Sequence, residues 1–526
     1  MGARTGKQYI ESMQKTSKGM EVYLNGERVR DVTQEPLFIG PMNSIAEQYD
    51  LQHDERYHDI LTYESPTSGE RVPSSFIIPK SKEDLIKKRQ TFKLRTDHSF
   101  GFMGRAPDFM NSLVTGWAIA KDIFSTRGEM FGENAQNYYE YCRENDLFLT
   151  HVLITPQVDR SKPSSEQEDP YIHLGRVRET SEGIVVRGAK MVGTFAPLTE
   201  EIYVLPFGGV APGDHLYATV FAIPTNTPGL KFICRETVAP IPRSRYDHPL
   251  SSRFEEMDAL AVFDDVLVPW NRVIVDGGPG SDELINHTMR AYAGSAAVQI
   301  ASRMLSQMEF LTGVAMKVAD AVGIDGFLHV QEKLGEMISH LEVGKSVYYG
   351  SEAMAYPDEK GIWQPGGLGL RSFHLQSMKI YRRMVEIIQT LAAGGFFSVP
   401  TEADMANPEI RPMIDKYLRG KPGVSAEEKV RIFKLAWDVT GEAFAQRMQQ
   451  YVHYFSGDPI RLTAAMYLGY DKSELYEMVA RAIDADSHSA IPVSPTLPGV
   501  PSALTKNINP SLRHTYPEST QPKRSG

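Results

Sequence analysis

Cysteine is nearly absent from this sequence of 526 residues, which contains only Cys142 and Cys234. Two cysteines cannot form a disulfide framework, a zinc site built mainly from thiolates, or a four-cysteine iron–sulfur cluster. No apolar run approaches the roughly 18 residues of a membrane-spanning helix, and the first residues lack the apolar core of a signal peptide. We therefore expect a cytoplasmic protein without a membrane partner.

Basic residues are also fewer than acidic ones. The sequence has 56 lysines and arginines and 66 aspartates and glutamates, which gives a net charge of −10. Such a balance argues against nucleic acid as the main partner. No HExxH motif or comparable set of metal ligands is present, so the sequence predicts no metal site. Gly344-Lys345-Ser346 resembles the end of a phosphate-binding loop, but Ser339 stands where the motif needs its first glycine.

The pattern of apolar residues divides the chain into four parts. Residues 1–148 are predicted to be mainly helical, with a hairpin at Asn25-Gly26, a dipeptide that favours tight two-residue turns. Residues 149–277 contain short runs rich in β-branched and aromatic residues, which predict a β-barrel or sandwich. Residues 278–490 return to helical spacing and predict a four-helix bundle, with residues 430–455 as one of its long helices. Residues 491–526 are rich in Pro, Ser, Thr and Asn and predict an extended tail.

This order of helices, strands and long helices defines an α+β fold that resembles the acyl-CoA dehydrogenase-like flavoproteins. Three segments carry a more specific resemblance: FGFMGRAPDFMN at 100–111, THVLITPQVDRSKP at 150–163 and GAKMVGTFAPLTEEIYVLPF at 188–207. Together and in this order they are similar to the 4-hydroxyphenylacetate 3-monooxygenase oxygenase components. These belong to the two-component flavin-dependent phenol hydroxylases, which include chlorophenol and nitrophenol monooxygenases.

The resemblance implies a reaction and a set of partners. A separate NAD(P)H:flavin reductase would supply reduced FAD (FADH2), and O2 would be the co-substrate. A flavin C4a-hydroperoxide would then hydroxylate a small phenolic substrate. The family also implies a homotetramer.

Two residues are implied as catalytic. Arg105 resembles the family's active-site arginine, a fixed cation for the reacting oxygen, although it could instead pair with Asp108. His151 matches the family histidine near flavin and substrate, where an imidazole can handle a proton; the alternative is a histidine satisfied within the core.

Other residues are implied to bind the ligands. Phe109, Phe207 and Thr194 would contact the substrate, although Phe207 could be a core residue and Thr194 could cap its own turn. Arg160 could equally form a salt bridge with Asp159. The residues implied to bind the cofactor are His151, Gln157, Arg160, Thr194, Arg447 and Gln450.

Two departures from the family pattern leave the substrate open. Phe109 stands where 4-hydroxyphenylacetate hydroxylases have tyrosine, and apolar Val298 stands where the chloro- and nitrophenol branch has a histidine. The sequence does not decide which phenol is used, whether a halide or nitro group leaves, or whether FAD or FMN is preferred. Acyl-CoA dehydrogenase-type flavoproteins and 4-hydroxybutyryl-CoA dehydratase-like lyases remain alternatives, although two cysteines cannot build the iron–sulfur cluster of the latter.

Overall fold

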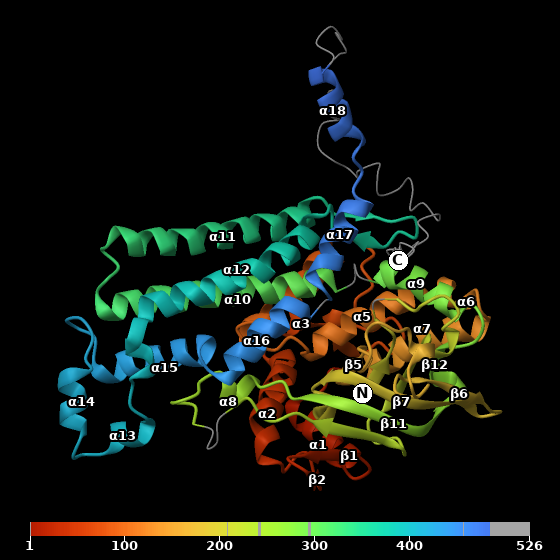
Figure 1. Ribbon diagram of the computed structural model, residues 1–526, viewed down its shortest axis with the longest axis horizontal. Coiled ribbons are helices and arrows are strands. Elements are labelled where there is room, and N and C mark those ends of the chain that lie inside the picture. Colours follow the sequence, from red (N-terminus) through yellow and green to blue (C-terminus); the bar gives the residue numbers. More distant parts are fainter. Residues whose placement is uncertain (1, 208, 240–243, 293–295, 456, 484–526) are drawn as a thin grey trace, which may run out of the picture.

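The chain folds into a mixed arrangement of helices and strands, which confirms the α+β prediction (Figure 1). The computed structural model describes residues 2–207, 209–239, 244–292, 296–455 and 457–483. The predicted tail at 491–526 lies outside the described residues, and the proposed domain limits stay predictions.

The N-terminal part is mainly helical, and the predicted hairpin at Asn25-Gly26 is confirmed. Its strands β1 (Glu21–Leu24) and β2 (Glu27–Val29) pair antiparallel, and both turn residues have positive φ, of 53° and 83°. The other elements of this part are α1 (Gly6–Ser17), α2 (Pro36–Asp50), α3 (His58–Leu61), β3 (Thr62–Glu64), β4 (Arg71–Pro73), α4 (Lys82–His98), α5 (Pro107–Ile119), α6 (Lys121–Ser125) and α7 (Glu129–Asn145).

Seven strands form in the region of short β-branched and aromatic runs after residue 148. They are β5 (Leu149–Val152), β6 (Gly175–Glu179), β7 (Gly183–Thr194), β8 (Glu201–Val204), β9 (Thr219–Pro224), β10 (Leu230–Cys234) and β11 (Asp258–Pro269). A further strand, β12 (Val273–Asp276), and the short helix α8 (Ser251–Phe254) complete this part.

The strands form two sheets. The larger has the order β2-β1-β10-β11-β7-β6, and the smaller has the order β12-β9-β8-β5. Phe221 of β9 packs edge-on against Phe263 of β11, with ring centroids 6.1 Å apart, so buried aromatic contacts join the sheets. The N-terminal hairpin belongs to the larger sheet, because β1 lies parallel to β10. The local sequence pattern of each strand does not predict which other strand it pairs with, so the pairing of β1 with β10 was not expected.

The C-terminal part is helical, and α10, α11 and α12 run alongside one another (Figure 1). Its elements are α9 (Ser281–Tyr292), α10 (Ala297–Val322), α11 (Leu328–Ala353), β13 (Tyr356–Pro357), β14 (Trp363–Gln364), α12 (Gly369–Ala392), α13 (Glu402–Ala406), α14 (Arg411–Tyr417), α15 (Ala426–Thr440), α16 (Ala443–Tyr454), α17 (Pro459–Gly469) and α18 (Ser473–Ile483). Within the described residues, no helix is both long and apolar enough to cross a membrane.

The prediction of one long helix over residues 430–455 is wrong, because the helix breaks into α15 and α16. Gly441 ends α15, and Glu442 has the extended conformation of an N-cap residue, with φ −77° and ψ 170°. A Cβ atom at Gly441 would lie 2.3 Å from the ring of Trp437, so this tight break depends on glycine. The apolar spacing continues across the break, which explains why periodicity alone missed it.

The two thiols lie in separate elements and are free. Cys142 is fully buried on α7, and burial raises the pKa of its thiol well above the usual value. Burial likewise raises the pKa of Cys234, on β10, to about 12. Both groups are therefore protonated at neutral pH.

A buried ion pair fixes the start of the chain to the β part. The guanidinium of Arg4 donates to both carboxylate oxygens of Glu200, at 2.6 and 2.7 Å. Glu200 also accepts from the backbone N–H of Phe148, at 2.8 Å. Both charged side chains are almost completely buried, so each depends on the other for compensation.

We expect Arg4→Met to lower the free energy of unfolding by roughly 3–5 kcal/mol, because it leaves the buried Glu200 carboxylate unpaired. Urea denaturation followed by circular dichroism measures this change. Arg56→Met is the matched control, since its pair with Asp54 is exposed and its loss should have little effect. Equal effects of the two substitutions would contradict a stabilising role for the buried pair.

Candidate functional site

Arg105 lies in the turn between α4 and α5 and is 4% exposed. Its backbone N–H donates to Glu256 Oε1 at 2.7 Å, and its Nη2 donates to the carbonyl of Phe455 at 3.0 Å. No carboxylate among the described residues pairs with its guanidinium, and its buried Nε has no hydrogen-bond partner there. The alternative pairing with Asp108 is not formed, and Asp108 instead faces Gln299. The Arg105 side chain is therefore a buried cation that remains available to a ligand.

Aromatic rings surround the Arg105 guanidinium. Its Cζ lies 4.1 Å from the ring centroid of Phe109, 5.4 Å from that of Tyr451 and 5.6 Å from that of Phe455. Such rings favour a cation over their faces. Gly104 permits the approach of α16, because a Cβ atom there would lie 2.1 Å from the Tyr451 hydroxyl.

His151 lies on β5, opposite Tyr203 of β8. Its ring packs edge-on against Phe109, with centroids 5.6 Å apart, so Phe109 contacts both His151 and Arg105. The buried Nδ1 has no partner among the described residues. Burial, with a further contribution from the charge of Arg105, holds the pKa of His151 well below its usual value. The imidazole is therefore neutral at pH 7 and can accept a hydrogen bond at this nitrogen.

Arg447 of α16 joins the bundle to the sheet. It donates to Glu256 Oε2 at 2.8 Å and to both oxygens of Asp258, at 3.0 and 2.7 Å. Although desolvation of the partly buried Asp258 acts to raise its pKa, the guanidinium charges of Arg447 and Arg235 hold the pKa of its carboxyl far below the usual range. All three donor groups of Arg447 are thus engaged within the protein, and its predicted contact with the cofactor stays a prediction.

Thr194 ends β7 beside this ion-pair network. Its hydroxyl donates to Asp258 Oδ1 at 2.7 Å, and its carbonyl accepts from the hydroxyl of Thr150 at 2.6 Å. The turn that follows β7 is thereby fixed to both β11 and β5. The Thr194 oxygen can still accept a hydrogen bond from a ligand, because a hydroxyl has two acceptor positions.

The remaining predicted site residues lie around this centre or on the surface. Phe207 is half-buried, and its ring lies beside Gly457, just past α16. Gln157 and Arg160 are exposed on the loop after β5. Asp159, the alternative partner of Arg160, instead forms an ion pair with Lys162 at 3.6 Å. Gln450 is exposed on α16 and accepts a long hydrogen bond from Arg382, at 3.5 Å.

The structure adds a second buried cation that the sequence analysis missed. Arg303 of α10 is completely buried, and its Nη1 donates to Gln307 at 3.0 Å. Its Nε and Nη2 have no partner among the described residues. Its Cζ lies 4.4 Å from the ring centroid of Phe455 and 5.5 Å from that of Tyr451, two rings that also face Arg105. The sequence does contain a signal for this residue, because Arg303 lies among the apolar positions 301, 304 and 305 on the buried face of an amphipathic helix.

His374 of α12 was also missed. Its ring centroid lies 5.2 Å from that of Phe455, and burial lowers the pKa of the imidazole to about 4. Its buried Nε2 has no partner in the described part of the chain. Val298 is buried on α10, and its side chain offers no hydrogen-bond acceptor. The imidazoles that the structure places against the rings around Arg105 are His151, on Phe109, and His374, on Phe455.

These groups define what the site can do chemically. Two buried guanidinium groups and the Tyr451 hydroxyl offer unengaged polar atoms, and aromatic rings line the space between them. A buried charge without compensation is costly, so this set fits a ligand that is anionic or rich in electrons. The planar ring of an anionic reduced flavin and the oxygen of a phenolate both have that character.

Known proteins are similar to this chain in both sequence and fold. The family models for the N-terminal and C-terminal parts of 4-hydroxyphenylacetate 3-hydroxylase match residues 5–275 and 288–484. The chain is 42% identical to the oxygenase component of 4-hydroxyphenylacetate 3-monooxygenase from Thermus thermophilus over 482 residues, covering 91% of this chain and 96% of that protein. It is 33% identical to the oxygenase component of 4-nitrophenol 2-monooxygenase from a Rhodococcus species, with 86% of each chain covered.

Solved structures give the same result. The structure of an oxygenase component of 4-hydroxyphenylacetate 3-monooxygenase complexed with FAD is 41% identical and superposes with a TM-score of 0.86, covering 92% of this chain and 99% of that one. A 4-hydroxybutyryl-CoA dehydratase superposes with a TM-score of 0.80 at 22% identity, covering 93% and 96% of the two chains, which shows a shared fold alone.

Asp108, beside Phe109 on α5, should make stability depend on pH. Burial raises the pKa of its carboxyl to about 6. The folded state thus binds the proton more tightly than the unfolded state, and stability falls as pH rises from about 4 to 6. Asp108→Asn should therefore gain up to about 3 kcal/mol of stability over wild type at pH 8, and much less at pH 4.

Thermal unfolding of both proteins from pH 4 to pH 8 measures this difference. Asp325→Asn, at an exposed position, is the matched control and should show a difference that does not change with pH. A pH-independent difference for Asp108→Asn would contradict the raised pKa.

Proposed function

Because the chain belongs to the 4-hydroxyphenylacetate 3-hydroxylase family, we propose that it is the oxygenase component of a two-component monooxygenase that hydroxylates a phenol with reduced FAD and O2. The observation that carries this proposal is the buried Arg105 guanidinium, which has no carboxylate partner among the described residues and lies against Phe109, itself packed on His151. When bound, reduced FAD supplies the electrons that activate O2 for insertion into the aromatic ring.

Arg105 binds the negatively charged oxygen of the reacting system. The cation is held in place by Glu256 on its backbone N–H and by the Phe455 carbonyl on its side chain, so no reorganisation is needed when charge develops. Its burial keeps competing water away and strengthens the electrostatic interaction.

His151 accepts a hydrogen bond from the phenol hydroxyl at its unengaged Nδ1. Its lowered pKa keeps the imidazole neutral and ready to accept a hydrogen bond. The edge-on contact with Phe109 fixes the orientation of the ring. His151 therefore makes the phenolic ring richer in electrons and orients it for hydroxylation.

Phe109, Phe207 and Thr194 are proposed to contact the substrate, and the absence of a hydroxyl at Phe109 makes this contact apolar. Arg303 and the predicted cofactor residues His151, Gln157, Arg160, Thr194, Arg447 and Gln450 are proposed to contact FAD. Arg447 also positions Glu256 and Asp258, so its substitution would disturb the site even without a direct contact.

A separate NAD(P)H:flavin reductase is the proposed partner, and the proposed assembly is a homotetramer. The exposed apolar residues of α18 support association, because Leu475, Met478 and Ile483 are 49%, 60% and 75% exposed on a helix that projects from the rest of the chain (Figure 1). Light scattering that finds only a 58.9 kDa particle would exclude the tetramer.

The proposal is tested with the purified protein, a generic flavin reductase, NADH, FAD and a panel of substituted phenols. Hydroxylated product should form only when the reductase is present. Activity with acyl-CoA substrates and a tightly held yellow flavin would instead favour the acyl-CoA dehydrogenase alternative. An oxygen-sensitive iron–sulfur protein would favour the dehydratase.

His151→Ala should uncouple the reaction, because the phenol loses the group that orients it and accepts a hydrogen bond from its hydroxyl. We expect product per NADH to fall about 10- to 100-fold while H2O2 rises. His53→Ala, at an exposed position, is the control. An unchanged ratio of product to NADH in His151→Ala would contradict this role of His151.

Arg105→Ala should lower hydroxylation about 100-fold or more, in keeping with the loss of a fixed charge-stabilising group. Arg105→Lys should recover only part of the rate, because an ammonium lacks the planar fork of donors. The rate of product formation at saturating phenol measures both effects. Full activity of either variant would show that the Arg105 guanidinium does not bind the reacting oxygen.

A further inference from the structure

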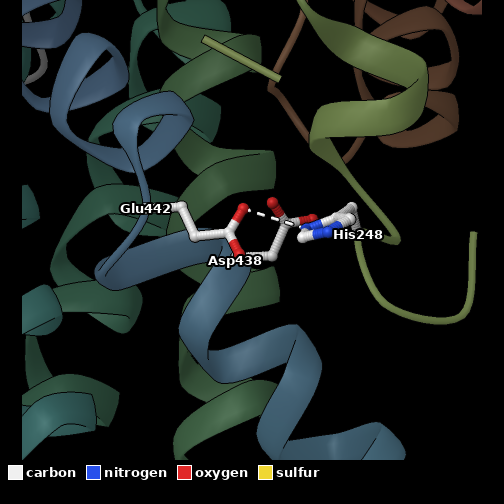
Figure 2. Close-up of side chains that lie close together, drawn as sticks. All are labelled: His248, Asp438 and Glu442. Atoms are coloured by element: carbon white, nitrogen blue, oxygen red, sulfur yellow. Dashed lines mark hydrogen bonds and ion pairs between the residues drawn. The ribbon is translucent and has the colours of Figure 1, made fainter. Parts of the chain in front are cut away.

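Three potential metal ligands meet away from the site around Arg105. His248 precedes α8, Asp438 lies in the last turn of α15, and Glu442 is the N-cap of α16 (Figure 2). One ligand atom from each residue lies within 4.8 Å of the other two. The helix break at Gly441 places the two carboxylates beside the same imidazole.

Asp438 has one oxygen engaged and one unengaged. Its Oδ2 accepts the backbone N–H groups of Leu250 at 2.6 Å and Ser251 at 3.0 Å, which fixes the orientation of the carboxylate. Its Oδ1 is buried and has no hydrogen-bond partner among the described residues. The residue is 0% exposed, so this oxygen cannot be satisfied by bulk water.

The other two ligands already have the separation that a small metal ion requires. His248 Nδ1 lies 3.1 Å from Glu442 Oε2, and ligand atoms about 2.0–2.2 Å from a tetrahedral ion are roughly 3.3 Å apart. The backbone N–H of His248 donates to the Ser244 carbonyl at 2.9 Å, which holds the imidazole in place. The third ligand atom lies within 4.8 Å of these two, so the Asp438 carboxylate would move inward to close the set around an ion.

The charge around the cluster favours a cation. Lys434, a nearby positive group on α15, forms an ion pair with Asp247 at 3.0 Å and is therefore engaged elsewhere. The buried Asp438 and the nearly buried Glu442 bring two carboxylates together beside His248, and a divalent ion that takes the place of the proton between His248 and Glu442 would balance both. The side chains of His248 and Glu442 are 18% and 12% exposed, which leaves a path for an ion to enter.

We propose that His248, Asp438 and Glu442 bind a divalent transition-metal ion of the zinc type, with Asp438 Oδ1, Glu442 Oε2 and His248 Nδ1 as ligands. One imidazole and two carboxylates form a ligand set that suits Zn2+ and Co2+. The ion has a structural role, because it fixes the segment that carries α8 to the junction of α15 and α16. This site does not depend on the proposed monooxygenase reaction.

Metal binding to the full-length protein tests the proposal. Chelator-treated protein is titrated with Zn2+ by calorimetry and with Co2+ by visible absorption. We expect one ion per chain, a d–d absorption band with Co2+ and a higher midpoint of thermal unfolding with Zn2+. Asp438→Asn, Glu442→Gln and His248→Phe should each weaken binding at least about 10-fold.

Glu428→Gln is the matched control, because it removes an exposed carboxylate from the first turn of the same helix. It should bind Zn2+ as wild type does. Circular dichroism checks folding; if Asp438→Asn does not fold, the partly exposed Glu442 and His248 variants decide the question. Wild-type protein that takes up no stoichiometric ion, or variants that bind as tightly as Glu428→Gln, would overturn the proposal.

Discussion

The candidate site depends on the ion pairs of Arg447 with Glu256 and Asp258. These two carboxylates lie at the entry to β11, and Glu256 also accepts the backbone N–H of Arg105, while Asp258 accepts the hydroxyl of Thr194. Arg447 is carried by α16, the helix that also provides Tyr451. The mostly buried Arg447 thus connects the turn after α4, the end of β7 and α16.

The arginines around this network differ in how their charge is compensated. Arg447 is neutralised by its carboxylates, whereas Arg105 and Arg303 lie deep among aromatic rings without such a partner in the described part of the chain. The protein thus compensates the charge of Arg447 by itself, whereas the charges of Arg105 and Arg303 would be compensated by a bound ligand. Burying a charge in advance is costly, and an anionic ligand that removes this cost gains affinity from it.

Local patterns predicted the secondary structure well, because each strand carried its own β-branched alternation and the hairpin its own Asn-Gly turn. They failed where a neighbour distant in sequence decides the outcome. The pairing of β1 with β10 is of this kind. The break at Gly441 is instead local, set by crowding against Trp437 in the preceding turn, and apolar spacing that continues across it hid the break. In the site, family motifs indicated Arg105 and His151, whereas Glu256, Arg303 and His374 gain their meaning only from residues brought together by the fold.

The environment of the two native thiols, one buried and one half-buried, gives the chain a practical property. Maleimides and related reagents attack the thiolate, and the raised pKa values of Cys142 and Cys234 keep that species scarce at neutral pH. A cysteine introduced on the exposed face of α18 would therefore carry a fluorescent or spin label selectively, without prior removal of the natural ones. Distances between such labels would report directly how neighbouring copies of this helix are arranged.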